Sequence, residues 1–88
     1  MHILYELQPI FSHRQSFYGR AHVLEINDSI ELYSYDTLVA RIKNGKFEYL
    51  WNDYSATTGI HVKDFLQQHG FPNMTKQQIL AHRRRDVI

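Results

Sequence analysis

The chain has 88 residues, of which 43% are hydrophobic, and its formal net charge is only +1. This length suits one domain with a modest core, and the composition excludes a disordered chain or a global field that attracts nucleic acid. Cysteine is absent, which excludes disulfide frameworks, thiolate nucleophiles and cysteine-based zinc sites. There is no apolar run near the roughly 20 residues of a membrane span and no signal-peptide core, so we expect a cytoplasmic protein.

The first pair of predicted strands lies on either side of Asn27-Asp28-Ser29. Taken as a three-residue loop, this segment places Leu24 opposite Leu32. The next connection, Tyr35-Asp36-Thr37, then places Leu32 opposite Ala40. Because side chains alternate between the two faces of a strand, this register gives one consistently apolar face.

A hairpin turn is predicted at Asn44-Gly45, between two runs of strand-forming residues. Asn-Gly supplies the two positive-φ positions of a type I′ turn. A two-residue loop places Ile42 opposite Phe47 on one face and Arg41 opposite Glu48 on the other, where the charges attract. Both faces are chemically consistent, which supports this register.

After the last predicted strand the pattern becomes helical. Ser55 or Thr57 can cap a first helix that ends at Gly70, and Thr75-Lys76-Gln77-Gln78 is a capping box that opens a short second helix. The predicted fold class is therefore α+β. We expect an antiparallel four-stranded β-meander followed by two C-terminal helices packed on one face, as a single domain over residues 1–88.

Short segments along nearly the whole chain form an ordered pattern. They are Leu4-Tyr5-Glu6-Leu7-Gln8-Pro9, Ser16-Phe17-Tyr18-Gly19-Arg20-Ala21, Ser34-Tyr35-Asp36-Thr37-Leu38-Val39-Ala40, Asn44-Gly45-Lys46, Tyr54-Ser55-Ala56-Thr57-Thr58, His61 and Phe65-Leu66. This pattern resembles a family of short proteins of unknown function from phages, plasmids and other mobile elements of Gram-positive bacteria. The resemblance implies no established activity, but a mobile-element origin favours accessory roles, including inhibition of host defence.

The sequence departs from the family pattern at Gly59-Ile60, where a bulkier or basic residue usually precedes the histidine. Glycine costs about 1 kcal/mol relative to alanine in a helix interior. We therefore expect a weakened first turn in this helix.

The most polar cluster lies at the start of the first predicted helix. Its residues are Tyr54, Ser55, Thr57, Thr58 and His61. Free N–H groups at this helix start could bind a phosphate, or a hydroxyl and His61 could form a nucleophile pair, although the sequence identifies no orienting carboxylate or oxyanion hole. In the structural alternative, which we favour, the hydroxyls cap the helix and His61 packs beside Phe65.

Six histidines raise the question of a metal site. They stand at positions 2, 13, 22, 61, 69 and 82, without an i, i+4 pair or a His-Glu-x-x-His pattern. His61 and His69 are more than two helical turns apart, too far for one ion. We expect neither a metal nor another cofactor.

The C-terminal end is basic, whereas residues 21–68 are on balance acidic. The basic residues of the second predicted helix and its end are Lys76, His82, Arg83, Arg84 and Arg85. They could contact phosphates or an acidic protein surface. Alternatively, they offset the helix dipole and are simply solvated.

The outer face of the predicted sheet, away from the helices, is more apolar than a solvated face requires. The predicted register places on it Val23, Tyr33, Tyr35, Val39 and Leu50. Two explanations stay open. The apolar N-terminal segment folds back over this face, or the face is a homodimer or partner interface with Tyr33 and Tyr35 as anchors.

The leading functional hypothesis is a non-enzymatic mobile-element accessory protein that binds a host macromolecule, a protein or a protein–nucleic-acid complex such as a defence nuclease. Binding would use the sheet face, the basic helix or both. One alternative is a direct nucleic-acid binder that uses the basic helix. The other is a small phosphate-binding or hydrolytic enzyme centred on residues 54–61.

Overall fold

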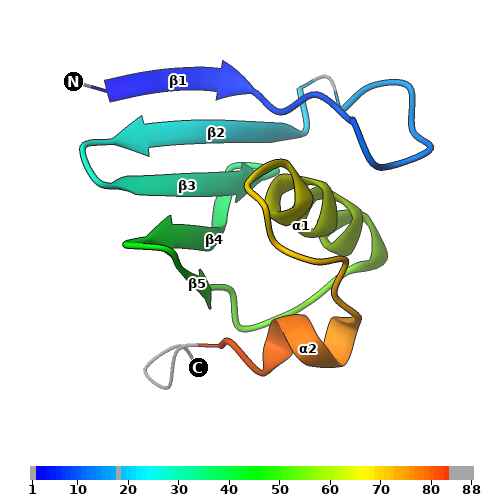
Figure 1. Cartoon of the computed structure of the whole chain (residues 1–88). Coiled ribbons are helices and arrows are strands. Elements are labelled where there is room, and N and C mark those ends of the chain that lie inside the picture. Colours follow the sequence, from blue (N-terminus) through cyan, green and yellow to red (C-terminus); the bar gives the residue numbers. More distant parts are fainter. Residues whose placement is uncertain (1, 18, 84–88) are drawn as a thin grey trace.

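The computed structural model describes residues 2–17 and 19–83. A five-stranded antiparallel sheet, with its strands in sequence order, is followed by two helices that pack on the sheet (Figure 1). The elements are β1 His2–Glu6, β2 Ala21–Ile26, β3 Ser29–Ser34, β4 Thr37–Lys43, β5 Lys46–Tyr49, α1 Ala56–Gln68 and α2 Lys76–Leu80. The predicted α+β class, meander and helix pair are confirmed, and the sheet has one strand more than expected.

The β4–β5 hairpin has the predicted register. Asn44 and Gly45 both adopt positive φ, as the two-residue turn requires. Ile42 faces Phe47, and both are buried in the core. On the opposite face, the Arg41 Nη2 lies 2.9 Å from the Glu48 Oε1. The local turn chemistry and the pattern of apolar residues agree here, so the prediction was reliable.

The predicted register between β2 and β3 is wrong by one residue. The turn contains two residues, Asn27 and Asp28, and Ile26 pairs directly with Ser29. Asn27 adopts φ of 48°, a left-handed conformation that asparagine tolerates. This conformation allows a turn one residue shorter than the predicted loop. Because side chains alternate, this shift moves Val23 into the core and turns Leu24 to the outer face.

A bulge in β4 explains why the predicted position of Val39 on the outer face is also wrong. Tyr35 and Asp36 both have positive φ and form a two-residue turn, so Ser34 pairs with Thr37. The register then shifts between Leu32 and Tyr33, and Val39 is the extra residue. Val39 is therefore fully buried rather than on the outer face.

The N-terminal segment forms β1, which extends the sheet at the edge of β2 (Figure 1). Of the two explanations left open for the outer face, the fold-back of the N-terminal segment over it is therefore wrong. After β1, Leu7 and Phe17 turn into the core on the helix side. The outer face of the sheet carries no other element among the described residues.

The core lies between the sheet and α1. Among the described residues, fourteen buried hydrophobic side chains form one cluster, which includes Phe65 and Leu66 of α1 and Leu32, Ala40 and Tyr49 of the sheet. The predicted N-cap at Ser55 is confirmed, since its hydroxyl accepts a hydrogen bond from the Thr58 N–H. None of the described helices is long and apolar enough to cross a membrane.

The second helix is short, and its predicted capping box is confirmed. The Thr75 hydroxyl accepts from the Gln78 N–H, and the Gln78 side chain accepts from the Thr75 N–H. α2 ends at Leu80, so His82 and Arg83 follow the helix instead of forming its last turn.

Candidate functional site

The polar cluster at the start of α1 is divided between surface and core. Ser55 is exposed and caps the helix, whereas Thr58 and His61 are buried. The Ser34 hydroxyl joins them, at 3.1 Å from the Thr58 Oγ1 and 2.9 Å from the His61 Nδ1. Ser34 was not among the predicted site residues, because its pairing with α1 depends on a contact between distant parts of the chain.

The His61 ring is enclosed by aromatic side chains. It packs edge-on against Phe17, with ring centroids 4.7 Å apart, and lies near Tyr35. The predicted contact partner Phe65 instead packs against His69, at 4.9 Å. Burial, with a smaller contribution from the nearby Arg14 and Arg20, lowers the pKa of His61 to about 4. His61 is thus held neutral near pH 7.

Ser34 and His61 have the hydrogen-bond geometry of a nucleophile and its base, but not the accessibility. Their exposed fractions are 2% and 1%, so a substrate cannot reach the Ser34 Oγ in this conformation. The nearest acidic residue on α1, Asp64, is fully engaged by other donors. The arrangement is a buried hydrogen-bond network that fixes β3 to α1.

The buried carboxylate of Asp64 anchors the loop after β1. It accepts hydrogen bonds from the backbone N–H groups of Ile10, Phe11 and Ser12, at 3.0–3.3 Å, and from the Gln68 Nε2 at 2.7 Å. Sequence reasoning missed this residue. The available signal was an acidic residue between Val62 and Phe65-Leu66, on the buried side of the helix.

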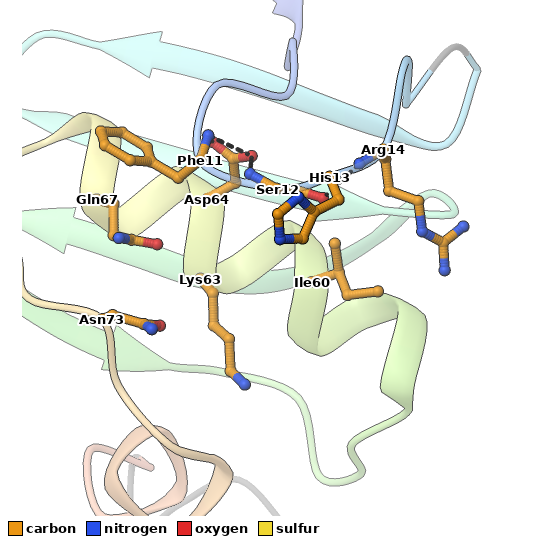
Figure 2. A pocket seen from close by; sticks show the side chains of 9 residues that line it. All are labelled: Phe11, Ser12, His13, Arg14, Ile60, Lys63, Asp64, Gln67 and Asn73. Carbon is orange, nitrogen blue, oxygen red and sulfur yellow. Dashed lines mark hydrogen bonds between the residues drawn. The ribbon is translucent and has the colours of Figure 1, made fainter.

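The anchored loop forms one wall of a groove with a volume of about 450 Å³. Figure 2 shows residues of the loop, of α1 and of the segment before α2 around it: Phe11, Ser12, His13, Arg14, Ile60, Lys63, Asp64, Gln67 and Asn73. Phe11 is 52% exposed, and Arg14 and Lys63 extend from the two sides of the groove. Because the Asp64 carboxylate is occupied by its hydrogen-bond donors, the charged groups that remain available in this groove are the cations of Arg14 and Lys63.

A second hollow, of about 500 Å³, lies on the outer face of the sheet. We call the residues around it the outer patch: Leu4, His22, Leu24, Tyr33 and Asp36. Leu4 is 67% exposed and pairs with Leu24 across β1 and β2. The Tyr33 hydroxyl donates to Glu31, which also lies 4.0 Å from Arg41, so the charges beside the patch are largely paired.

The outer patch replaces most of the predicted sheet-face residues. Val23 and Val39 are fully buried, so their predicted place on the outer face is wrong. Tyr35 is 53% exposed but lies at the β3–β4 turn near His61, on the helix side. Tyr33 lies on the outer face, as predicted, and Leu50 is half-buried after β5.

The predicted basic residues near the C-terminus contact the body of the protein individually. The Lys76 ammonium lies 5.3 Å above the centre of the Tyr54 ring. The His82 ring lies beside Phe47, and the Arg83 guanidinium donates to the Asn52 carbonyl oxygen. The other two predicted residues, Arg84 and Arg85, lie outside the described residues.

Gly59, which was expected to weaken the first turn of α1, packs under the Tyr54 ring. A Cβ at this position would overlap the end of the Tyr54 side chain. The glycine therefore allows this aromatic ring to close over the start of α1. Its cost in helix propensity is offset by the contact that it permits.

Within residues 2–17 and 19–83, no group of three or more histidine and acidic side chains is arranged to hold a metal ion. The family model that matches the chain is that of a family of unknown function (DUF8033), over residues 5–81. Neither the curated proteins nor the solved structures include a significant match.

Proposed function

The chain belongs to the DUF8033 family of unknown function, and for this member we propose a binding function carried by the outer patch. In this proposal the protein is a non-enzymatic accessory protein of a mobile element, and it binds a host protein, such as a component of a defence nuclease. The mobile-element setting rests on the sequence resemblance alone.

The observation that carries the proposal is an apolar hollow on a sheet face that no other described element covers. The open face of an antiparallel sheet is normally polar, whereas here Leu4, Leu24 and Tyr33 line a shallow depression. Tyrosine is a frequent anchor at protein interfaces because its ring is apolar and its hydroxyl forms hydrogen bonds. Asp36 at the rim favours a partner with an apolar side chain flanked by lysine or arginine.

Two tyrosines provide a matched test. We expect Tyr33→Ser to weaken capture of a host partner from lysate by about tenfold or more, because a central aromatic anchor is lost. Tyr35→Ser is the control, since Tyr35 is exposed on the helix side of the sheet. Capture would be quantified by mass spectrometry. Equal capture by the wild type, Tyr33→Ser and Leu24→Ser proteins would contradict the proposal.

The groove beside α1 favours nucleic acid as a second candidate partner. Two cations, Arg14 and Lys63, line the groove together with the exposed Phe11, and a base can stack on such a ring while its phosphates contact the cations. The groove, rather than the end of α2, is therefore the better candidate surface for the nucleic-acid alternative.

Anisotropy titrations with a single-stranded oligonucleotide at two salt concentrations test this second candidate. We expect Arg14→Gln/Lys63→Gln to weaken binding and reduce its salt dependence, because two phosphate contacts are removed. Arg83→Gln, outside the groove, should have little effect. A larger effect of Arg83→Gln would move the site to the basic C-terminal residues, and no binding by the wild type at low salt would exclude the candidate.

A further inference from the structure

The outer edge of β1 is open, and both faces of this strand are exposed. Ile3 and Tyr5 on the helix side are 47% and 38% exposed, and Leu4 on the outer face is 67% exposed. In Figure 1, β1 lies at one edge of the sheet with no described element beyond it. Three large apolar side chains in succession are therefore accessible on a strand that has only one neighbour.

The backbone groups on the free edge can be assigned from the ladder with β2. The Leu7 N–H donates to the Ala21 carbonyl, so Leu7 and Ala21 form a hydrogen-bonded pair. Hydrogen-bonded and non-hydrogen-bonded pairs alternate in an antiparallel ladder, which places Ile3 and Tyr5 in the bonds to β2. The N–H and C=O groups of His2, Leu4 and Glu6 consequently point away from the sheet.

β1 lacks the features that protect edge strands from pairing. Proteins usually block such edges with a lysine, a proline, a bulge or a covering segment. The strand His2–Glu6 contains no lysine or proline, and its register with β2 is regular. The opposite edge differs, because the Tyr49 N–H in β5 donates to the His82 carbonyl. The β5 edge is thus partly covered, whereas no described element covers the edge of β1.

We propose that two copies of this chain pair through antiparallel β1 strands. With Leu4 opposite Leu4 of the second copy, all outward-pointing backbone groups of His2, Leu4 and Glu6 meet partners. This register places His2 opposite Glu6 of the second copy, where an imidazole N–H can donate a hydrogen bond to the carboxylate. It also places Ile3 opposite Tyr5 of the second copy, a favourable β-branched–aromatic pair. Shifting the strands by two residues would lose both Ile3–Tyr5 pairs and both His2–Glu6 contacts.

The pairing joins the two sheets into one and extends their outer faces. Leu24 and Leu4 of each copy would form a continuous apolar row across the two-fold axis. One strand pair buries less surface than a standard interface of about 800 Å² per partner, so the dimer dissociates readily. Self-association needs no host protein and does not depend on the proposed function.

Sedimentation equilibrium at protein concentrations up to roughly 1 mM tests the pairing. Wild type should be a monomer–dimer mixture. Leu4→Pro should be monomeric, because it removes an outward N–H while leaving the ladder with β2 intact. Leu4→Ala is the matched control, which keeps the N–H and should still dimerise, more weakly. Circular dichroism and urea unfolding check that Leu4→Pro is folded.

Charge substitutions at His2 give an independent test that does not alter the backbone. His2→Lys should strengthen and His2→Glu should weaken dimerisation, with dissociation constants that differ by about tenfold, because each dimer contains two contacts with Glu6. A wild type that stays monomeric at the highest concentration would overturn the proposal. So would a dimer that is insensitive to the charge at position 2 and to proline at position 4.

Discussion

Replacing Asp64 with alanine is expected to lower the free energy of unfolding by about 3 kcal/mol. The buried carboxylate accepts hydrogen bonds from three consecutive backbone N–H groups, of residues 10–12, and from Gln68. Hydrogen bonds to a charged acceptor are stronger than neutral ones, and alanine leaves the three backbone N–H groups without this acceptor. The loop after β1 would lose its attachment to α1, and the groove in Figure 2 would lose a wall.

Urea unfolding measures this effect, and limited proteolysis reports on the loop. Asp53→Ala is the matched control, because its exposed carboxylate accepts from a single N–H, that of Tyr54. Asp64→Asn keeps one acceptor oxygen and should be destabilised less than Asp64→Ala. We expect rapid cleavage within residues 8–17 only in the Asp64 variants. Equal stability of the Asp64→Ala and Asp53→Ala proteins would contradict the role assigned to this carboxylate.

Acidification is expected to destabilise the protein through His61. Burial lowers its folded-state pKa from 6.5 to about 4, so the unfolded chain binds this proton more readily than the folded protein. The contribution of neutral His61 to the free energy of unfolding is therefore fully present above pH 6.5 and is lost as the pH falls from 6.5 toward 4. The free energy of unfolding should decrease by about 2 kcal/mol between pH 7 and pH 5.

Urea unfolding at several pH values, compared with a His61→Gln variant, isolates this contribution. Glutamine cannot take up the proton, so this part of the pH dependence should disappear, although the variant is less stable overall. His13→Gln, at an exposed position, is the control and should retain the wild-type dependence. A His61→Gln protein with an unchanged slope between pH 7 and pH 5 would show that the slope arises elsewhere.

The accuracy of the sequence predictions followed the strength of the local signals. Asn44-Gly45 specifies both the type and the length of its turn, so the register of β4 and β5 followed correctly. The capping residues Ser55 and Thr75 likewise act on their own helix starts. In each case, the interactions that decide the structure lie within a few residues of the signal.

Where two turn lengths were compatible with the pattern, the prediction failed. Asn27-Asp28-Ser29 suits a loop of two or three residues, and the apolar residues on both faces of β2 could not distinguish them. The β4 bulge at Val39 compensated for a shorter turn at Tyr35-Asp36, which left the pairing of Leu32 with Ala40 unchanged. These two errors therefore cancelled for Leu32 and Ala40 but moved Val39 to the core, whereas the shorter turn at Asn27-Asp28 moved Val23 there.

The candidate sites depended on contacts between distant parts of the chain, which a single sequence does not reveal. Asp64 binds a loop more than 50 residues away, and Ser34 bonds to a histidine 27 residues later. Leu4 and Tyr33 share the outer patch only because β1 adds to the sheet at β2. Sequence alone indicated an apolar outer face, but the residues that form it required the register.

Methyl-resolved NMR of the protein bound to its captured partner tests most directly whether the outer face carries the function. The methyl signals of Leu4 and Leu24 should shift on binding, whereas those of Ile60 in the groove and Ile79 in α2 should stay in place. Shifts confined to Ile60, with Leu4 and Leu24 unchanged, would contradict the proposed surface.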